Sequence, residues 1–117
     1  MNSQQLTALA QSALDDLKAK DVTVIDITDK SSIADAMVIA TGTSDRHVGA
    51  LANEVVFQAK AAGEQPLGIE GESSSDWVLV DLGDVIVHVM TQKARDFYEL
   101  EKLWSVKPSQ REAGIAN

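Results

Sequence analysis

The sequence predicts one small domain of the α/β class, a mixed (α+β) sheet flanked by helices in the order α-β-β-α-β-β-β-α. Three observations predict it: a length of 117 residues with 44% hydrophobic content, two amphipathic stripes at helical spacing, and a hairpin signal between two apolar runs. A chain of this length buries roughly two-thirds of its unfolded surface, enough for a core of its own. We expect the domain to span residues 1–105.

The first part of the chain predicts a helix and two strands. Apolar residues recur at helical spacing over residues 4–18, and Asn2 and Gln5 have the spacing of a capping box. The β-branched residues of 22–27 favour a strand. The uninterrupted apolar run 36–40 is too short for a surface helix and indicates a buried strand.

A second helix is predicted to begin after Ser44, a suitable N-cap, and to end before Gly63, which suits the position after a helix. Between them lies an apolar stripe: Val48, Leu51, Ala52, Val55, Val56 and Ala59. Residues 66–70 then predict a short third strand. The passage from strand 36–40 through this helix to strand 66–70 predicts a parallel crossover.

The clearest signal is a hairpin of residues 77–82 and 85–90 around the two-residue turn Gly83-Asp84. Such a turn fixes the register, so the side chains divide between the two faces of the sheet. One face is wholly aliphatic and is expected in the core: Val78, Val80, Leu82, Val85, Val87 and Val89. The other face is mixed: Trp77, Leu79, Asp81, Ile86, His88 and Met90.

Two interpretations of the mixed face stay open. Helices could cover it, as they cover both faces of many sheets, and Trp77 would then be a core residue. Alternatively, part of the face receives a partner protein, since tryptophan and methionine are enriched at interfaces. Asp81 and His88 would then supply polar contacts. A metal site at His88 would need further ligands, and the chain has no cysteine and one other histidine, His47.

Thr91 is predicted to cap a last helix that runs to Trp104. Its apolar side chains are expected to face the core or a partner: Ala94, Phe97, Leu100, Leu103 and Trp104. The helical periodicity is lost after about residue 105. Residues 106–117, which include Pro108 and Gly114, are expected to form a flexible tail.

The formal net charge of −8 argues against a protein that grips nucleic acid, because such binding needs a basic patch. The charge suits a basic protein partner, although it is also explained by solubility alone. No apolar run approaches the roughly 20 residues that span a bilayer, and the start of the chain does not resemble a signal peptide. We therefore expect a cytoplasmic protein that needs no metal or other cofactor.

The best case for an active site is Gly42-Thr43-Ser44-Asp45, because backbone N–H groups before a helix can hold phosphate. The segment is similar to the Gly-Ser segment of nucleotidyltransferases. Those enzymes also need carboxylates on neighbouring strands to hold Mg²⁺, and the nearest pair here is Glu70 and Glu72, interrupted by a glycine. Helix capping alone also explains the segment. A nucleotidyltransferase is therefore the alternative to a binding protein.

Four segments of the chain resemble the motifs of the ribosomal silencing factor family, also called Iojap-related. They read DAMVIATGTSDRHV at 35–48, GIEG at 68–71, DWVLVDLGDVIVHV at 76–89 and YELEKLW at 98–104. The match covers roughly residues 4–105 in one order. Four long motifs in register are far more specific than a single glycine pattern.

The resemblance implies a nucleotidyltransferase-like fold without the catalysis, and a function in translation. Members of the family bind the large ribosomal subunit through its protein L-fourteen, at the face where the small subunit docks, and repress translation when nutrients run short, as in stationary phase. The mechanism is steric, because an occupied surface cannot form the bridge between subunits. Some members form homodimers, so a homodimer, or a dimeric scaffold without a ribosomal target, stays open.

The resemblance also implies which residues bind the partner. The docking motif of the family matches positions on the hairpin and on the last helix, and the pleat of the hairpin adds Leu79 to them. The expected partner-binding residues are Trp77, Leu79, Asp81, His88, Met90, Tyr98 and Trp104. Arg46 and His47 match the first motif without an assigned role. No catalytic, cofactor-binding or metal-binding residue is expected.

Overall fold

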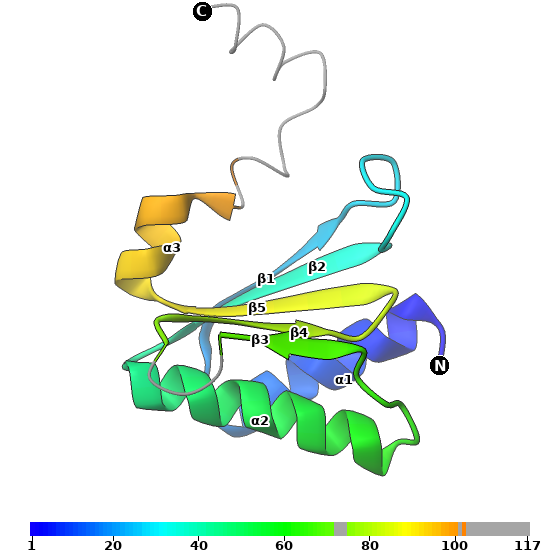
Figure 1. The fold of residues 1–117 in the computed structure, drawn as a ribbon, viewed down its shortest axis with the longest axis horizontal. Coiled ribbons are helices and arrows are strands. Elements are labelled where there is room, and N and C mark those ends of the chain that lie inside the picture. The colour runs from blue at the N-terminus through cyan, green and yellow to red at the C-terminus, as the bar shows by residue number, and fades with distance from the viewer. Residues whose placement is uncertain (72–74, 101, 103–117) are drawn as a thin grey trace, which may run out of the picture.

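The computed structural model describes residues 1–71, 75–100 and 102, and these form a single sheet with helices on both faces (Figure 1). The elements follow one another in the predicted order: α1 (Ser3–Asp16), β1 (Lys20–Asp26), β2 (Ala36–Gly42), α2 (Asp45–Ala61), β3 (Gly68–Glu70), β4 (Trp77–Asp81), β5 (Val85–Thr91) and α3 (Gln92–Tyr98). The strand order across the sheet is β1-β2-β5-β4-β3. Helices α1 and α2 lie on one face, and α3 lies over one end of the other. The predicted mixed sheet flanked by helices is confirmed.

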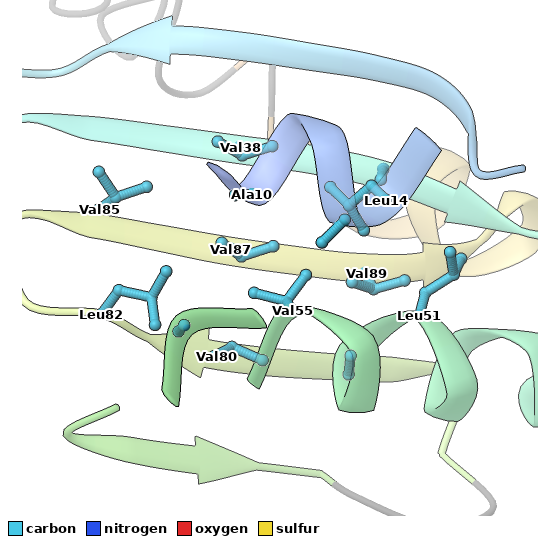
Figure 2. Packing of buried hydrophobic residues seen from close by; sticks show 14 of the residues in the cluster. Ala10, Leu14, Val38, Leu51, Val55, Val80, Leu82, Val85, Val87 and Val89 are labelled. Carbon is cyan, nitrogen blue, oxygen red and sulfur yellow. The ribbon is translucent and has the colours of Figure 1, made fainter. Parts of the chain in front are cut away.

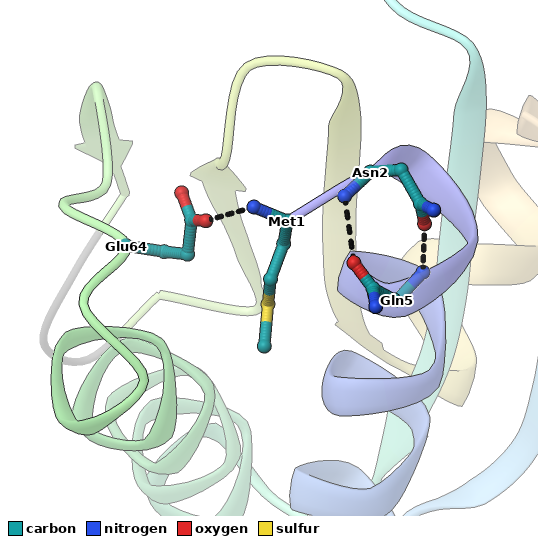
Figure 3. Close-up of polar contacts among 4 residues, drawn as sticks. All are labelled: Met1, Asn2, Gln5 and Glu64. Atoms are coloured by element: carbon teal, nitrogen blue, oxygen red, sulfur yellow. Dashed lines mark hydrogen bonds and ion pairs between the residues drawn. The ribbon is translucent and has the colours of Figure 1, made fainter.

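Helix α1 begins with the predicted capping box (Figure 3). The backbone N–H of Gln5 donates a hydrogen bond of 2.8 Å to Oδ1 of Asn2, and the N–H of Asn2 donates one of 3.0 Å to Oε1 of Gln5. These bonds satisfy donors at the helix start that have no partner within the helix. The Met1 ammonium lies 2.6 Å from Oε1 of Glu64, which ties the start of α1 to the segment after α2.

Helix α2 is bounded as the sequence predicts. Oγ of Ser44 accepts a hydrogen bond of 3.1 Å from the N–H of His47, and Gly63 follows the helix with a φ of +85°. Gly42, at the end of β2, lies directly against the first turn of α2. A Cβ at that position would lie 2.8 Å from Cγ2 and 2.9 Å from the backbone nitrogen of Val48, so the approach requires a glycine.

The position of β3 corrects the predicted crossover. Strands β2 and β3 run in the same direction, but β5 and β4 lie between them, and β5 is the parallel neighbour of β2. The physical reason is burial. Every residue of β2 is buried, as are most of those in β5, whereas the three residues of β3 are all partly or fully exposed. The two most apolar strands take the centre of the sheet, where both faces are covered.

The main core fills the space between the sheet and helices α1 and α2 (Figure 2). The predicted hairpin register is confirmed, because Val78 lies opposite Val89 and Val80 lies opposite Val87. All six side chains of the predicted aliphatic face are buried in this core. They pack with residues of α1 and α2 that include Ala10, Leu14, Leu51 and Val55.

Helix α3 is shorter than predicted, although Leu100 and Lys102 beyond its end are again helical. Thr91 caps it as expected, with Oγ1 accepting a hydrogen bond of 3.3 Å from the N–H of Ala94. The helix ends at Tyr98 because Glu99 adopts a left-handed conformation with φ +51°, which stops the hydrogen-bonded ladder. Phe97 is 79% exposed and does not face the core. The predicted positions of Leu103 and Trp104 and the predicted tail 106–117 fall outside the described residues.

Candidate partner-binding site

The sheet face opposite α1 and α2 is only partly covered, and we call it the open face. Among the described residues α3 is the one helix on it, over the end where β5 stops (Figure 1). A second, smaller buried cluster lies on this face: Ile27, Ala34, Met37, Ile39, Met90 and Ala94. Trp77 and Ile86 at its border are only partly buried. The mixed face of the hairpin is thus covered at one end and accessible beyond it. The structure therefore lies between the two interpretations that the sequence left open, which were coverage by helices and an open surface for a partner.

Trp77 lies at the centre of an aromatic group on the open face. Its ring centroid is 4.5 Å from that of Tyr98 and 5.7 Å from that of His88, with tilted planes in both pairs. Its Nε1–H donates a hydrogen bond of 2.9 Å to Nδ1 of His88. The indole is therefore held in one orientation while part of it stays exposed, the arrangement of a preorganised contact.

His88 acts as the acceptor that fixes Trp77. It is only 5% exposed, and burial lowers the pKa of its imidazole from 6.5 to about 4, so the ring is neutral at pH 7. Because Nδ1 accepts the hydrogen bond from Trp77, the ring proton must lie on Nε2. The polar role of His88 at neutral pH is thus to orient the tryptophan, without carrying a charge.

Three residues form the accessible part of this group, and we call them the Trp77 patch: Trp77, Leu79 and Tyr98. Leu79 lies directly opposite His88 in the β4–β5 pairing and is partly buried, whereas Tyr98 is 49% exposed. The exposed Phe97 extends the patch, with its ring edge-on to Tyr98 at 5.0 Å. The patch therefore combines a fixed indole, a second aromatic ring and an aliphatic side chain, which is the composition of an interface centre.

Two other predicted binding residues make contacts within the chain. Met90 pairs with Trp77 across the hairpin and has no exposed surface, so it supports the patch from below. Oδ1 of Asp81 accepts a hydrogen bond of 2.8 Å from the N–H of Gly83 and thereby stabilises the hairpin turn. Trp104 lies outside the described residues.

Carboxylates are close neighbours of the Trp77 patch in the sequence. Asp76 precedes the tryptophan, and Asp96 and Glu99 lie on either side of Phe97 and Tyr98 in the sequence. All three are exposed. Exposed carboxylates next to aromatic contact residues in the sequence favour a partner surface with basic residues, because complementary charges speed encounter and disfavour wrong partners.

The Gly42-Thr43-Ser44-Asp45 segment uses its polar groups within the chain. The N–H of Thr43 donates a hydrogen bond of 2.9 Å to Nδ1 of His47, and Nε2 of the same ring lies 2.7 Å from the carbonyl oxygen of Leu17. His47 therefore connects the end of α1 to the start of α2, while Arg46 is exposed. A backbone donor that a bound phosphate would need is already paired, which favours the capping explanation of this segment.

The carboxylates predicted for a nucleotidyltransferase are not assembled by the described residues. Glu70 ends β3 at the edge of the sheet, three strand spacings from β2, or about 14 Å. Glu72 falls outside the described residues. Within residues 1–71, 75–100 and 102, no group of three or more histidine, aspartate or glutamate side chains could hold a metal ion. The helices of the same part of the chain include none that is long and apolar enough to cross a membrane.

Sequence reasoning missed Arg95, which is 8% exposed and buried beneath α3. Its guanidinium donates hydrogen bonds to the carbonyl oxygen of Asp21 at 2.6 Å, to Oγ1 of Thr41 at 2.8 Å and to Oγ1 of Thr23 at 2.9 Å. The only signal in the sequence was its place beside Ala94, on the side of the predicted helix that faces the sheet. An arginine at such a place is normally assigned to the solvent.

Comparison with known families identifies the chain. The family model described as "Ribosomal silencing factor during starvation" matches residues 1–116. The chain belongs to the ribosomal silencing factor family. This confirms the family that the four sequence motifs predicted, and it places the chain in a ribosome-associated family.

Individual relatives in the family match over most of their length. The "Ribosomal silencing factor RsfS" of Chromobacterium violaceum is 47% identical over 110 residues, which are 93% of this chain and 90% of the relative. The protein of the same name from Haemophilus influenzae is 46% identical over 86% of this chain and 98% of its own length. "Protein Iojap-related, mitochondrial" from Arabidopsis thaliana is 39% identical over 82% of this chain and 54% of its own length.

Solved structures also match the fold. A crystal structure of a protein from Chromobacterium violaceum superimposes with a TM-score of 0.88 at 47% identity, over 92% of this chain and 91% of that one. A second crystal structure, from Bacillus halodurans, gives a TM-score of 0.80 at 40% identity, over 87% of this chain and 95% of that one. The arrangement of sheet and helices described above is therefore the arrangement of solved proteins at 40% identity or more.

Proposed function

We propose that this protein binds the large ribosomal subunit through ribosomal protein L-fourteen and thereby prevents the small subunit from joining, as a non-catalytic repressor of translation in nutrient limitation. The site of contact is the Trp77 patch, together with Trp104 of the predicted motif. Such a protein acts where ribosomal subunits meet, which for a bacterial ribosome is the cytoplasm. The proposal combines membership of the ribosomal silencing factor family with the chemistry of this surface.

The observation that carries the proposal is the partly exposed but fixed indole of Trp77. Its ring packs on Tyr98 and its N–H is bound to His88, so little side-chain entropy would be lost when a partner covers it. Tryptophan and tyrosine are the side chains that most often dominate the free energy of an interface. The helices on the opposite face offer no comparable group, because Phe57 of α2, which is 66% exposed, has no aromatic contact among the described residues.

The charge of the chain supports a ribosomal protein as the partner, rather than ribosomal RNA. The chain carries 18 acidic and 10 basic residues, and the exposed Asp76 and Glu99 directly adjoin Trp77 and Tyr98 in the sequence. RNA phosphates would be repelled by such a surface, whereas a basic ribosomal protein would be attracted. Binding should therefore weaken as the salt concentration rises.

Co-sedimentation with purified large subunits tests the proposal. The wild-type protein should bind at low salt, and Trp77→Ala should bind at least about tenfold more weakly, the effect of losing a dominant interface residue. Phe57→Ala is the matched control, because it removes an exposed aromatic ring from the opposite side of the molecule, and it should bind like the wild type.

Trp77→Ala should also destabilise the fold, and this effect must be separated from its effect on binding. Because Trp77 packs on Tyr98 and His88, its removal should lower the free energy of unfolding by about 1–2 kcal/mol, so binding is measured well below the melting temperature. Absence of binding by the wild-type protein at low salt would refute the proposal. A subunit-joining assay then asks whether bound large subunits fail to form complete ribosomes.

A further inference from the structure

We propose that Arg95 is a positioning residue for the partner site: it holds α3 on the end of the sheet, so that Tyr98 lies against Trp77. The local part of this inference concerns only contacts within the chain. Its consequence for ribosome binding rests on the proposed function.

Helix α3 needs an anchor because it is short. It has seven residues, and helices of that length are not stable in water without tertiary contacts. The buried residues of α3 are Ala94 and Arg95. Ala94 contributes a single methyl group to the cluster beneath the helix, and Leu100 packs against that cluster just after the helix, while the hydrogen bonds of Arg95 supply the polar attachment of the helix to the strands.

The hydrogen bonds of Arg95 reach two strands, β1 and β2. Nη1 donates to the carbonyl oxygen of Asp21 and to Oγ1 of Thr41, and Nη2 donates to Oγ1 of Thr23. The pairing of β1 with β2 is irregular between Lys20 and Thr23, and Asp21 has a φ of +48°. This bulge leaves the Asp21 carbonyl free of the regular ladder at the point where it accepts from Arg95. The site for the guanidinium is thus built from backbone and side-chain acceptors of fixed strands.

Arg95 and Tyr98 are three residues apart, so they project from neighbouring positions on one side of α3. Fixing Arg95 on the sheet therefore also fixes Tyr98, whose ring centroid lies 4.5 Å from that of Trp77. If α3 detached for most of the time, only the attached fraction could present the complete patch. The apparent dissociation constant would rise in inverse proportion to that fraction, about tenfold for an attached fraction of roughly one-tenth.

Two variants test the role of Arg95, and each is compared with a control. Arg95→Gln removes the guanidinium, and Thr41→Val removes one of its acceptors while keeping nearly the same volume. Lys93→Ala is the control for charge, because it removes a positive charge from an exposed position of the same helix. Thr41 is 4% exposed and lies beneath α3, so its substitution alters no surface that a partner could touch.

The first readout requires no ribosome. In a Trp104→Phe background the tryptophan fluorescence comes from Trp77 alone. Arg95→Gln and Thr41→Val should shift its emission to longer wavelength and make acrylamide quenching more efficient, because Tyr98 no longer covers the indole. Lys93→Ala should leave both measurements unchanged. Far-UV circular dichroism verifies that each variant is folded, and if Arg95→Gln does not fold, Thr41→Val alone decides the outcome.

The second readout is the affinity for large subunits, measured with Trp104 intact. Arg95→Gln should bind about tenfold more weakly and Lys93→Ala within about twofold of the wild type. Unchanged Trp77 fluorescence in a folded Arg95→Gln or Thr41→Val variant would overturn the inference, and so would weaker binding without a change at Trp77, since Arg95 would then act by another route. Failure of the wild-type protein to bind subunits would instead refute the proposed function and leave the fluorescence result to decide the positioning role.

Discussion

Lowering the pH should destabilise the protein through His88. The imidazole is neutral in the folded protein down to about pH 4, whereas in the unfolded chain it takes up a proton near pH 6.5. Between these values the unfolded state binds more protons than the folded state, so the free energy of unfolding falls as the pH falls. The loss begins near pH 6.5 and is complete near pH 4.

The size of the effect follows from the two pKa values. The interval from 6.5 to about 4 corresponds to a total of ~3 kcal/mol, and ~2 kcal/mol of that should be lost between pH 7 and pH 5. Protonation at Nδ1 would also remove the acceptor for the Trp77 N–H, so in the folded protein the tryptophan should lose its fixed orientation only near pH 4 and below.

Urea unfolding at pH 7 and pH 5 measures the effect, with His88→Asn as the comparison. Asparagine offers an oxygen acceptor near the position of Nδ1 but does not titrate. The variant keeps every other titratable group of the chain, so the difference between the two pH dependences isolates His88. We expect the wild type to lose ~2 kcal/mol more than the variant between the two pH values. Equal losses would show that His88 is not held neutral by its burial.

Two further predictions concern contacts at the starts of helices. Gly42→Ala should lower the free energy of unfolding by about 1–3 kcal/mol, because its Cβ would lie 2.8 Å from Cγ2 of Val48 and the start of α2 would have to move; thermal unfolding equal to that of the wild type would contradict this. Asn2→Ala should lower it by about 1 kcal/mol through loss of the cap that Gln5 shares, and urea unfolding should show a smaller loss for Asn2→Asp, which keeps the accepting oxygen.

The features that the sequence predicted correctly are those set by neighbouring residues. The Gly83-Asp84 turn determines the register of the hairpin, and the caps at Asn2, Ser44 and Thr91 mark where three helices begin. Each depends on a few side chains and the local backbone, so periodicity and capping chemistry are sufficient. The aliphatic face of the hairpin followed from the register alone.

The features that the sequence did not predict depend on segments far apart in the chain. The place of β5 between β2 and β4 depends on how all the strands compete for the buried centre of the sheet. The left-handed Glu99 ends α3 without a glycine to mark it. The hydrogen bond from Trp77 to His88 joins residues that are diagonal neighbours on the sheet. The sequence predicted that both side chains lie on the same face, but not that they turn toward each other. Arg95 reaches residues more than 50 positions away.

Because α1 and α2 both pack on one face of the sheet, they determine how thick the molecule is behind the Trp77 patch. A helix layer about 10 Å across lies behind a sheet whose other side carries the Trp77 patch. The helix layer and the spacing between it and the sheet add up to roughly 20 Å. A surface to which the patch is bound would therefore carry an added layer of that thickness. Two large surfaces that must meet closely would be kept apart by this thickness, whatever residues α1 and α2 show to the outside. The helices can therefore act as a spacer.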